Sequence, residues 1–417
     1  MKKFWMFSFL AVFGLLLLLF FTNDFGIMDI QKTSFIIAMG IDKGQQDGTI
    51  HVTAQVAIPD EAEGVKASDI SVENIETIGD AIAKVNLKTG WYPSLVHCRL
   101  IILGKDVLST NVFDNLNYFL ENNVVEDSCL IATSNKTASE TLKATSPIGE
   151  VTANAISKVL SSEAQKTGSV SVSTLREFAK TYYAPAKSGY LPTLDIRAEA
   201  DSASGGGGSN TSDSAGGSSG GDSQSGSSGG SGGSSDSSSG NSADIIDASQ
   251  TDLFYDGKFV GRMNGDQTLA FNIAKTKTHY AFANVDAIVN GEQKNYALKI
   301  KIVKKLMHVT MENGVPVLRF TIRGRVNIED SNKSTNLLGM VQSSNVPEAV
   351  LKSLEEKINR NLTEIVTLSG QTNCDIFEVI DSVHKRYYDK YKAEYGTLLQ
   401  KVRPVFDVKF LSSNKIL

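Results

Sequence analysis

The residue types that perform most enzyme chemistry stand apart from one another in this chain. No histidine belongs to an H-E-x-x-H zinc motif, and there is no G-x-x-x-x-G-K-[ST] phosphate loop. Residues 216–220 match the hydrolase pattern G-x-S-x-G, but that motif needs a strand before it and a helix after it. We therefore predict no catalytic, cofactor-binding or metal-ligating residue, and no cofactor. The five histidines are His51, His97, His279, His308 and His384.

Adjacent carboxylates could hold a cation, and a glycosidase needs only two carboxylates that meet in space. Neighbouring acidic residues on turns and helix surfaces are normally solvated, so we favour that interpretation. An enzyme is the third hypothesis, and a deep pocket with converging carboxylates of shifted pKa would support it. The acidic pairs are Glu126-Asp127, Glu329-Asp330 and Glu355-Glu356.

The cysteines Cys98, Cys129 and Cys374 are too few and too widely spaced for a disulfide framework or a zinc site. A Cys98–Cys129 bridge could form outside the membrane, but buried thiols on apolar strands are favoured. The net charge of −5 argues against nucleic-acid binding, because phosphate contacts need a basic surface.

An apolar run from Phe4 to Phe21 follows Lys2 and Lys3. About twenty apolar residues in a helix can cross a membrane, and the two lysines favour a cytoplasmic N-terminus. A cleaved signal peptide is the alternative, but its apolar core is normally shorter and ends at a small-residue site that this run lacks. We therefore predict an uncleaved signal anchor with the rest of the chain outside the cytoplasm.

The segment Asp201 to Ala243 is mostly Gly, Ser and Asp and has no branched apolar or aromatic residue, so it cannot build a core. The length of 417 residues also favours more than one domain. We predict four parts: a transmembrane signal anchor at 1–23, an N-terminal α+β domain at 24–200 that could consist of two subdomains, a disordered linker at 201–245 and a C-terminal α+β domain at 246–417.

In the first half, alternating residues predict an antiparallel strand pair at 33–41 and 49–58. A helix follows around Ile78 and Val85, with Ser71 or Asn74 as its cap and Gly90 as its end. The order indicates a mixed sheet covered by helices, an α+β fold. Further elements are expected as strands at 96–103 and 129–133 and helices at 112–120, 137–144, 152–160 and 173–182.

After the linker, Asp256-Gly257 between apolar runs predicts a hairpin of strands 251–255 and 258–263. Further strands are expected between His279 and Ile328. Two helices should follow, one opened by Pro347 and one over 375–399, with a last strand at 402–411.

The strand 297–303 alternates apolar residues with lysines, which indicates one core face and one wet face. The lysines could face anionic lipid or an acidic partner. We favour the simpler interpretation that they protect an exposed strand from aggregation. The lysines concerned are Lys299, Lys301, Lys304 and Lys305.

Several stretches in order resemble the Ger(x)C family, the C subunits of spore germinant receptors. Ile37-Ala38-Met39-Gly40-Ile41-Asp42-Lys43-Gly44, with a strand ending Val56-Ala57-Ile58-Pro59, is similar to the opening of that family. The resemblance covers nearly the whole chain outside the linker. The other similar stretches are 100–106, Leu191-Pro192, the hairpin 253–263, Asp375-Ile376-Phe377 and the last strand 402–410.

The chain departs from the family pattern in two places. Asp24 and Phe25 stand where the family has a lipobox cysteine and a tryptophan, and Asp29-Ile30 stands at its Glu-Ile. Without the acyl anchor, only a retained apolar segment can hold the chain to a membrane. The Gly/Ser linker is also longer than the family leads us to expect.

The resemblance implies a non-enzymatic subunit of a nutrient receptor at the outer face of the spore inner membrane. Its implied partners are an integral membrane subunit of transporter-like fold and a second membrane subunit. A tethered extracytoplasmic substrate-binding protein, independent of a receptor, is the alternative.

Gly40 and Gly261 lie near strand ends, and a β-branched residue at either is expected to be damaging.

Overall fold

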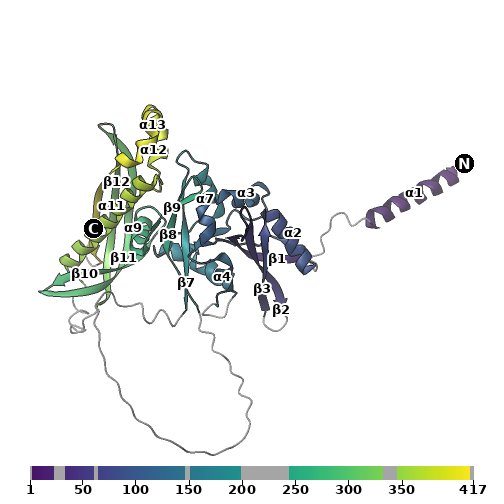
Figure 1. Ribbon diagram of the computed structural model, residues 1–417, viewed down its shortest axis with the longest axis horizontal. Coiled ribbons are helices and arrows are strands. Elements are labelled where there is room, and N and C mark those ends of the chain that lie inside the picture. The colour runs from purple at the N-terminus through teal and green to yellow at the C-terminus, as the bar shows by residue number, and fades with distance from the viewer. Residues whose placement is uncertain are drawn as a thin grey trace, which may run out of the picture.

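The computed structural model shows an α+β protein built on two sheets, which stand side by side along its long axis (Figure 1). The linker segment 201–243 and the positions 24, 25, 29 and 30 lie outside the described residues. The structure describes residues 2–22, 33–60, 64–145, 151–198, 244–331 and 345–413.

The apolar run at the N-terminus forms helix α1 (Lys2–Thr22). No helix among the described residues has both the length and the apolar character needed to cross a membrane.

The larger sheet has the strand order β3-β2-β1-β5-β6-β7-β8-β9, with β4 beside β1. β1 pairs antiparallel with β2, as predicted, and parallel with β5. The bounds are β1 (Thr33–Lys43), β2 (Ile50–Asp60), β3 (Gly64–Ile75), β4 (Tyr92–Ser94), β5 (Leu100–Leu103), β6 (Leu130–Ser134), β7 (Ser188–Ala198), β8 (Asp244–Tyr255) and β9 (Lys258–Met263).

Helices cover both faces of this sheet, which explains why β5 is apolar throughout. Ile101 and Leu103 pack in a core with α2, α3 and α7, whereas Leu100 and Ile102 face α4 and α5. The helices are α2 (Ile78–Thr89), α3 (Phe113–Glu121), α4 (Ala138–Lys143), α5 (Thr152–Val159), α6 (Ser162–Lys166) and α7 (Leu175–Tyr182), with a 3₁₀ turn η2 (Lys105–Ser109).

The smaller sheet has the order β10-β11-β12-β13, and α9, α11 and α12 pack in its core. The apolar stripe of α11 is buried against it, as Val350, Leu354 and Ile358 show. The bounds are β10 (Tyr280–Val289), β11 (Glu292–Glu312), β12 (Val315–Ser331), β13 (Arg403–Ser412), α9 (Gly265–Ala274), α11 (Glu348–Thr372), α12 (Val379–Arg386), α13 (Tyr388–Glu394), η3 (Tyr395–Thr397) and η4 (Leu399–Lys401).

The two strands that follow residue 243 belong to the larger sheet. β8 pairs antiparallel with β7, from Ser188 opposite Tyr255 to Ala198 opposite Asp244. The hairpin β8–β9 turns at Asp256 and Gly257, which both have positive φ, as the predicted hairpin requires. The parts of the chain before and after the linker therefore share one sheet.

Some local predictions were wrong. Ser71 and Asn74 lie in strand β3, which the sequence analysis did not predict, and Thr77 caps α2 by accepting from the Asp80 N–H. Gly90 ends this helix in the left-handed region, as predicted.

Two longer elements also differ from expectation. Leu191-Pro192 lies inside strand β7, where no strand was predicted. The single helix expected over 375–399 is broken into α12, α13 and two 3₁₀ turns. The break lies at Tyr387, whose backbone leaves the helical region with φ −139° and ψ 52° between α12 and α13. Asp375 stands outside α12 and accepts hydrogen bonds from its first N–H groups, so the helix begins later than expected.

Candidate functional site

The five histidines lie on separate elements or loops. His384 has its ring centre 4.6 Å from that of Tyr391, and His97 lies 5.1 Å from Phe35, so both serve as aromatic partners. Within the described part of the chain, no three His, Cys, Asp or Glu side chains come together as a metal site.

The acidic pairs of the sequence analysis make structural contacts. Asp127 forms an ion pair with Arg176, and Glu355 Oε1 accepts the Phe410 N–H at 2.8 Å. Glu356 lies 3.9 Å from Lys352 on the exposed surface of α11. The three cysteines are buried and free, and both the contact with Cys98 and burial raise the pKa of the Cys129 thiol. Such thiols are poor nucleophiles.

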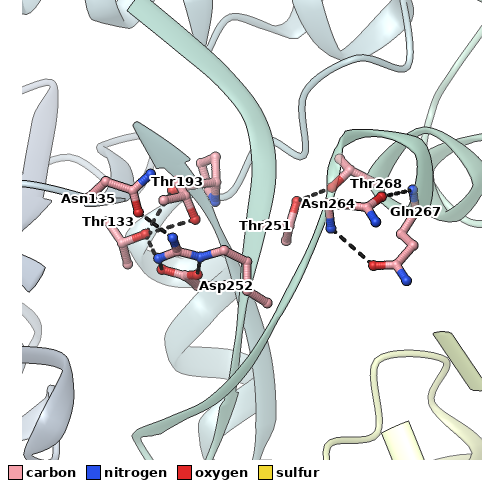
Figure 2. A network of polar contacts seen from close by, with 10 residues as sticks. Thr133, Asn135, Thr193, Thr251, Asp252, Asn264, Gln267 and Thr268 are labelled. Atoms are coloured by element: carbon pink, nitrogen blue, oxygen red, sulfur yellow. Dashed lines mark hydrogen bonds and ion pairs between the residues drawn. The ribbon is translucent and has the colours of Figure 1, made fainter. Parts of the chain in front are cut away.

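A buried ion pair joins β8, β9 and the end of β6 (Figure 2). Asp252 is fully buried, and its carboxylate accepts from Arg262 Nε at 2.5 Å and Nη2 at 3.1 Å. The Thr133 hydroxyl donates to the same carboxylate at 2.6 Å, and Arg262 Nη1 donates to Asn135 Oδ1. Because hydrogen bonds from three strands or strand ends meet here, the network fastens the β8–β9 hairpin to the first half of the chain.

The same hairpin is fixed to helix α9 by a second set of contacts. Thr251 and Thr268 share a hydrogen bond of 3.1 Å between their hydroxyl oxygens (Figure 2). Asn264 and Gln267 form a reciprocal capping box at the start of α9, with N–H···O distances of 2.9 and 3.0 Å. In both networks the polar side chains are held by one another, and the contacts fix the hairpin in place.

A cleft of about 960 Å³ lies between the helices of the first half and the C-terminal half. Glu177 and Lys180 of α7 line one side. The other side is lined by residues 275–277 and by Asp375, Ile376, Glu378, Asp381 and Lys385. No histidine and no cysteine lines it.

Lys275 is the central charge of this cleft. Its Nζ donates to the Ile376 carbonyl at 2.6 Å, pairs with Glu378 Oε1 at 3.0 Å and lies 5.8 Å from the ring centre of Tyr190. The charge of Lys275 lowers the pKa of Glu378, and burial raises the pKa of the Tyr190 phenol.

Asp375 lies at the edge of the same cleft and is buried. Its carboxylate accepts from the Val379 N–H at 2.8 Å and the Ile380 N–H at 2.6 Å, and its own N–H donates to Ser188 Oγ at 2.8 Å. Burial raises the pKa of Asp375 to about 6.

The mixture of cations, carboxylates and one phenol suits a small polar ligand better than an apolar one. Sequence reasoning missed this cleft because its residues come from segments about a hundred positions apart, such as Lys275 and Glu378, with no motif to connect them. The hydrogen bonds that hold these residues could not be predicted from the sequence either, because they form only when the two halves of the chain fold together.

Two family models match this chain. The model for the spore germination protein N-terminal domain matches residues 26–196, and the model described as spore germination B3/GerAC like, C-terminal, matches residues 249–409. The chain belongs to the GerAC-like family of spore germination proteins. This confirms the resemblance to germinant receptor C subunits, and the second match begins inside β8, so the family's C-terminal part includes the hairpin held by Asp252 and Arg262.

Among solved structures, the GerAC-like chain is similar to the crystal structure of the GerBC protein. The identity is 14%, the match covers 93% of this chain and 100% of that one, and the TM-score is 0.44. No curated protein matches.

Proposed function

We propose that this chain is a non-enzymatic, membrane-anchored subunit of a nutrient germinant receptor, acting in complex assembly or signalling at the outer face of the spore inner membrane. The observation that carries this proposal is the ordered match of both family models, which together extend from residue 26 to residue 409.

Membrane attachment is supported by the apolar run Phe4–Phe21 behind Lys2 and Lys3. Asp24 stands where the family has its lipobox cysteine, so an acyl chain at this position cannot take the place of the apolar run as the membrane anchor. Intact-mass analysis of the protein from spores should show an N-terminus that is retained and carries no lipid. A mature chain that begins near Asn23 would contradict the anchor.

The proposed partners are an integral membrane subunit of transporter-like fold and a second membrane subunit. Co-purification from detergent-solubilised spores tests this, with an affinity tag after Leu417 to keep the N-terminus unchanged. Both membrane subunits should elute with the chain, and spores that lack the chain should fail to respond to nutrients. Recovery of the chain alone, under detergent conditions that keep the other two together, would contradict the proposal.

A tethered substrate-binding protein is the second candidate, and the cleft around Lys275 is the observation that favours it. Binding of a small polar nutrient there should raise the midpoint of thermal unfolding. Lys275→Met should remove that increase, whereas Lys105→Met on the exposed surface should keep it. No shift with any free amino acid or sugar would count against this candidate.

A further inference from the structure

The face of the smaller sheet that points away from α11 is strongly basic, although the whole chain carries a net charge of −5. Alternate residues of β11 and β12 point into the core, as Ile300, Phe320 and Ile322 show by their burial. The residues between them point outward. The register places Lys301 opposite Arg325 and Lys304 opposite Arg323, and the third strand adds Lys409 beside Arg323.

Basic side chains outnumber carboxylates over this surface, which we call the outer face of the β10–β13 sheet. Asp286 and Asp330 lie at its end, opposite Asn295 and Ala297, and Glu312 and Asp407 lie on the face itself. The basic residues are Lys299, Lys301, Lys304, Arg319, Arg323, Arg325, Arg403 and Lys409.

The two carboxylates on the outer face are already held by arginines. Asp407 accepts from Arg323 Nη2 at 2.6 Å, and Glu312 accepts from Arg319 at 2.5 Å and from Arg403 at 2.7 Å. Hydrogen bonds from arginine lower the pKa of both acids. These contacts show that guanidinium groups on this face are placed within hydrogen-bond reach of carboxylates, and they leave Arg319, Arg323 and Arg403 already paired within the chain.

Other cations on the outer face have no such partner. Among the described residues, no ion pair includes Lys299, Lys301, Lys304, Arg325 or Lys409. Asp407 is near enough for the charges of Lys304 and Lys409 to lower its pKa, but it pairs with Arg323. In the same part of the chain, Arg325 Nε is buried without a hydrogen-bond partner. A buried donor of this kind costs free energy until an acceptor reaches it.

Exposed apolar side chains lie beside these cations. Tyr280 and Phe282 of the edge strand β10 are 42% and 51% exposed, and Lys299 Nζ lies 5.9 and 5.7 Å from their ring centres. Val303 and Leu306 of β11 are each 49% exposed. Aromatic and arginine side chains on a rigid surface are typical of protein interfaces.

We propose that the outer face of the β10–β13 sheet docks an acidic segment of another protein. Figure 1 shows this sheet at the opposite end of the molecule from α1 and β1. The choice of a protein over a lipid surface rests on the proposed function, which assigns α1 to the membrane. The charge of the face by itself does not distinguish an acidic protein from an anionic lipid surface. The simpler interpretation of Lys299 and Lys301 as protection for an exposed strand does not account for the arginines that β12 contributes.

The test uses the full chain in a neutral detergent and a fluorescent oligo-glutamate peptide as the probe. The variant Lys301→Glu/Arg325→Glu should weaken binding at least about tenfold, because it reverses two neighbouring charges. The control Lys105→Glu/Lys143→Glu changes the net charge equally at exposed sites elsewhere and should stay within about twofold of the parent. Added salt should weaken the parent's binding. Equal affinity of parent and both variants would overturn the proposal.

Two further measurements keep the result decisive. Lys301→Gln/Lys304→Gln removes charge without reversing it and replaces the first variant if that one does not fold. Acetylation of Lys299 and Lys301 is then compared in phosphatidylglycerol and phosphatidylcholine nanodiscs. Protection by phosphatidylglycerol, with no peptide binding, would overturn the proposal in favour of a lipid surface. Peptide binding by a chain that does not co-purify with receptor subunits would leave the basic face standing and contradict the proposed function.

Discussion

Gly104 lies against the carboxylate of Asp42, so closely that a Cβ on Gly104 would overlap Asp42 Oδ1. Asp42 lies next to the last residue of strand β1 and is buried, and its oxygens accept from the N–H groups of Ala138 at 2.6 Å and Ser139 at 2.9 Å. Helix α4 has its own N-cap at Thr137, but its first two N–H groups are held by a residue far away in sequence, and Gly104 provides the space for that carboxylate.

Gly104→Ala should lower the free energy of unfolding by about 2 kcal/mol, because the new methyl group displaces the Asp42 carboxylate from the helix terminus. Gly265→Ala is the matched control, since its nearest neighbour would be Ser249 Oγ at 3.5 Å, an ordinary contact. Denaturant unfolding of the full chain in detergent measures both. Equal midpoints for the two variants would show that the contacts of Asp42 with α4 do not depend on Gly104.

Gly40 and Gly261 should respond differently to alanine. A Cβ on Gly40 would lie 2.9 Å from the Ala138 Cβ, whereas one on Gly261 would lie 3.4 Å from the Thr372 methyl group. Gly40→Ala should therefore cost about 1–3 kcal/mol, and Gly261→Ala less than about 0.5 kcal/mol. The contact of 2.9 Å accounts for the damage expected from a side chain at Gly40, whereas the ordinary contact of 3.4 Å at Gly261 does not. Unfolding midpoints check the difference, and a larger loss at Gly261 would refute it.

Arg262→Ala should destabilise the fold by roughly 3 kcal/mol, because it leaves the Asp252 carboxylate buried without its charge partner. Arg197→Ala is the control, since Arg197 pairs with Asp195 at 2.6 Å but is 53% exposed, and its loss should cost less than about 1 kcal/mol. Thermal unfolding compares them. The pair would be unimportant if Arg262→Ala were no more destabilising than Arg197→Ala.

Asp375 should make stability depend on pH. Its pKa is about 6 when folded and 3.8 in the unfolded reference, so the folded chain binds the proton more readily. Its contribution to stability therefore rises as pH falls from about 7 to 4, by roughly 3 kcal/mol at most.

Asp375→Asn should lose this dependence, while Asp80→Asn on the exposed start of α2 should keep it. The measurement is the unfolding free energy of each variant across that pH range. If the difference in unfolding free energy between the parent and Asp375→Asn stays the same across this pH range, the assignment of the pH dependence to Asp375 is wrong.

Cleavage within 201–243 should leave two fragments that stay together, because β7 and β8 on either side of the segment pair over most of their length. A protease of broad specificity is needed, since the segment has no Lys or Arg. The fragments should co-elute in size-exclusion chromatography and separate only in denaturant. Two folded fragments that elute separately would instead indicate that residues 201–245 separate two independent domains.

Local patterns in the sequence determined those elements whose signals lie within a few residues. The hairpin at Asp256-Gly257 needs only positive φ at two adjacent positions, and the α11 stripe needs only helical spacing. Strand β3 was missed because its alternation is weak. The helix over 375–399 was overextended because its start depends on the buried Asp375 and because no local pattern marks the non-helical backbone at Tyr387.

The tertiary structure alone decided what lies next to what. The Asp252–Arg262 pair could be suspected from its hairpin, but its contacts with Thr133 and Asn135 required β6 and β8 to enter one sheet. The cleft at Lys275 and the basic outer face likewise combine residues from distant strands and helices. Burial and strand register set these contacts, and both are properties of the folded chain that no local spacing encodes.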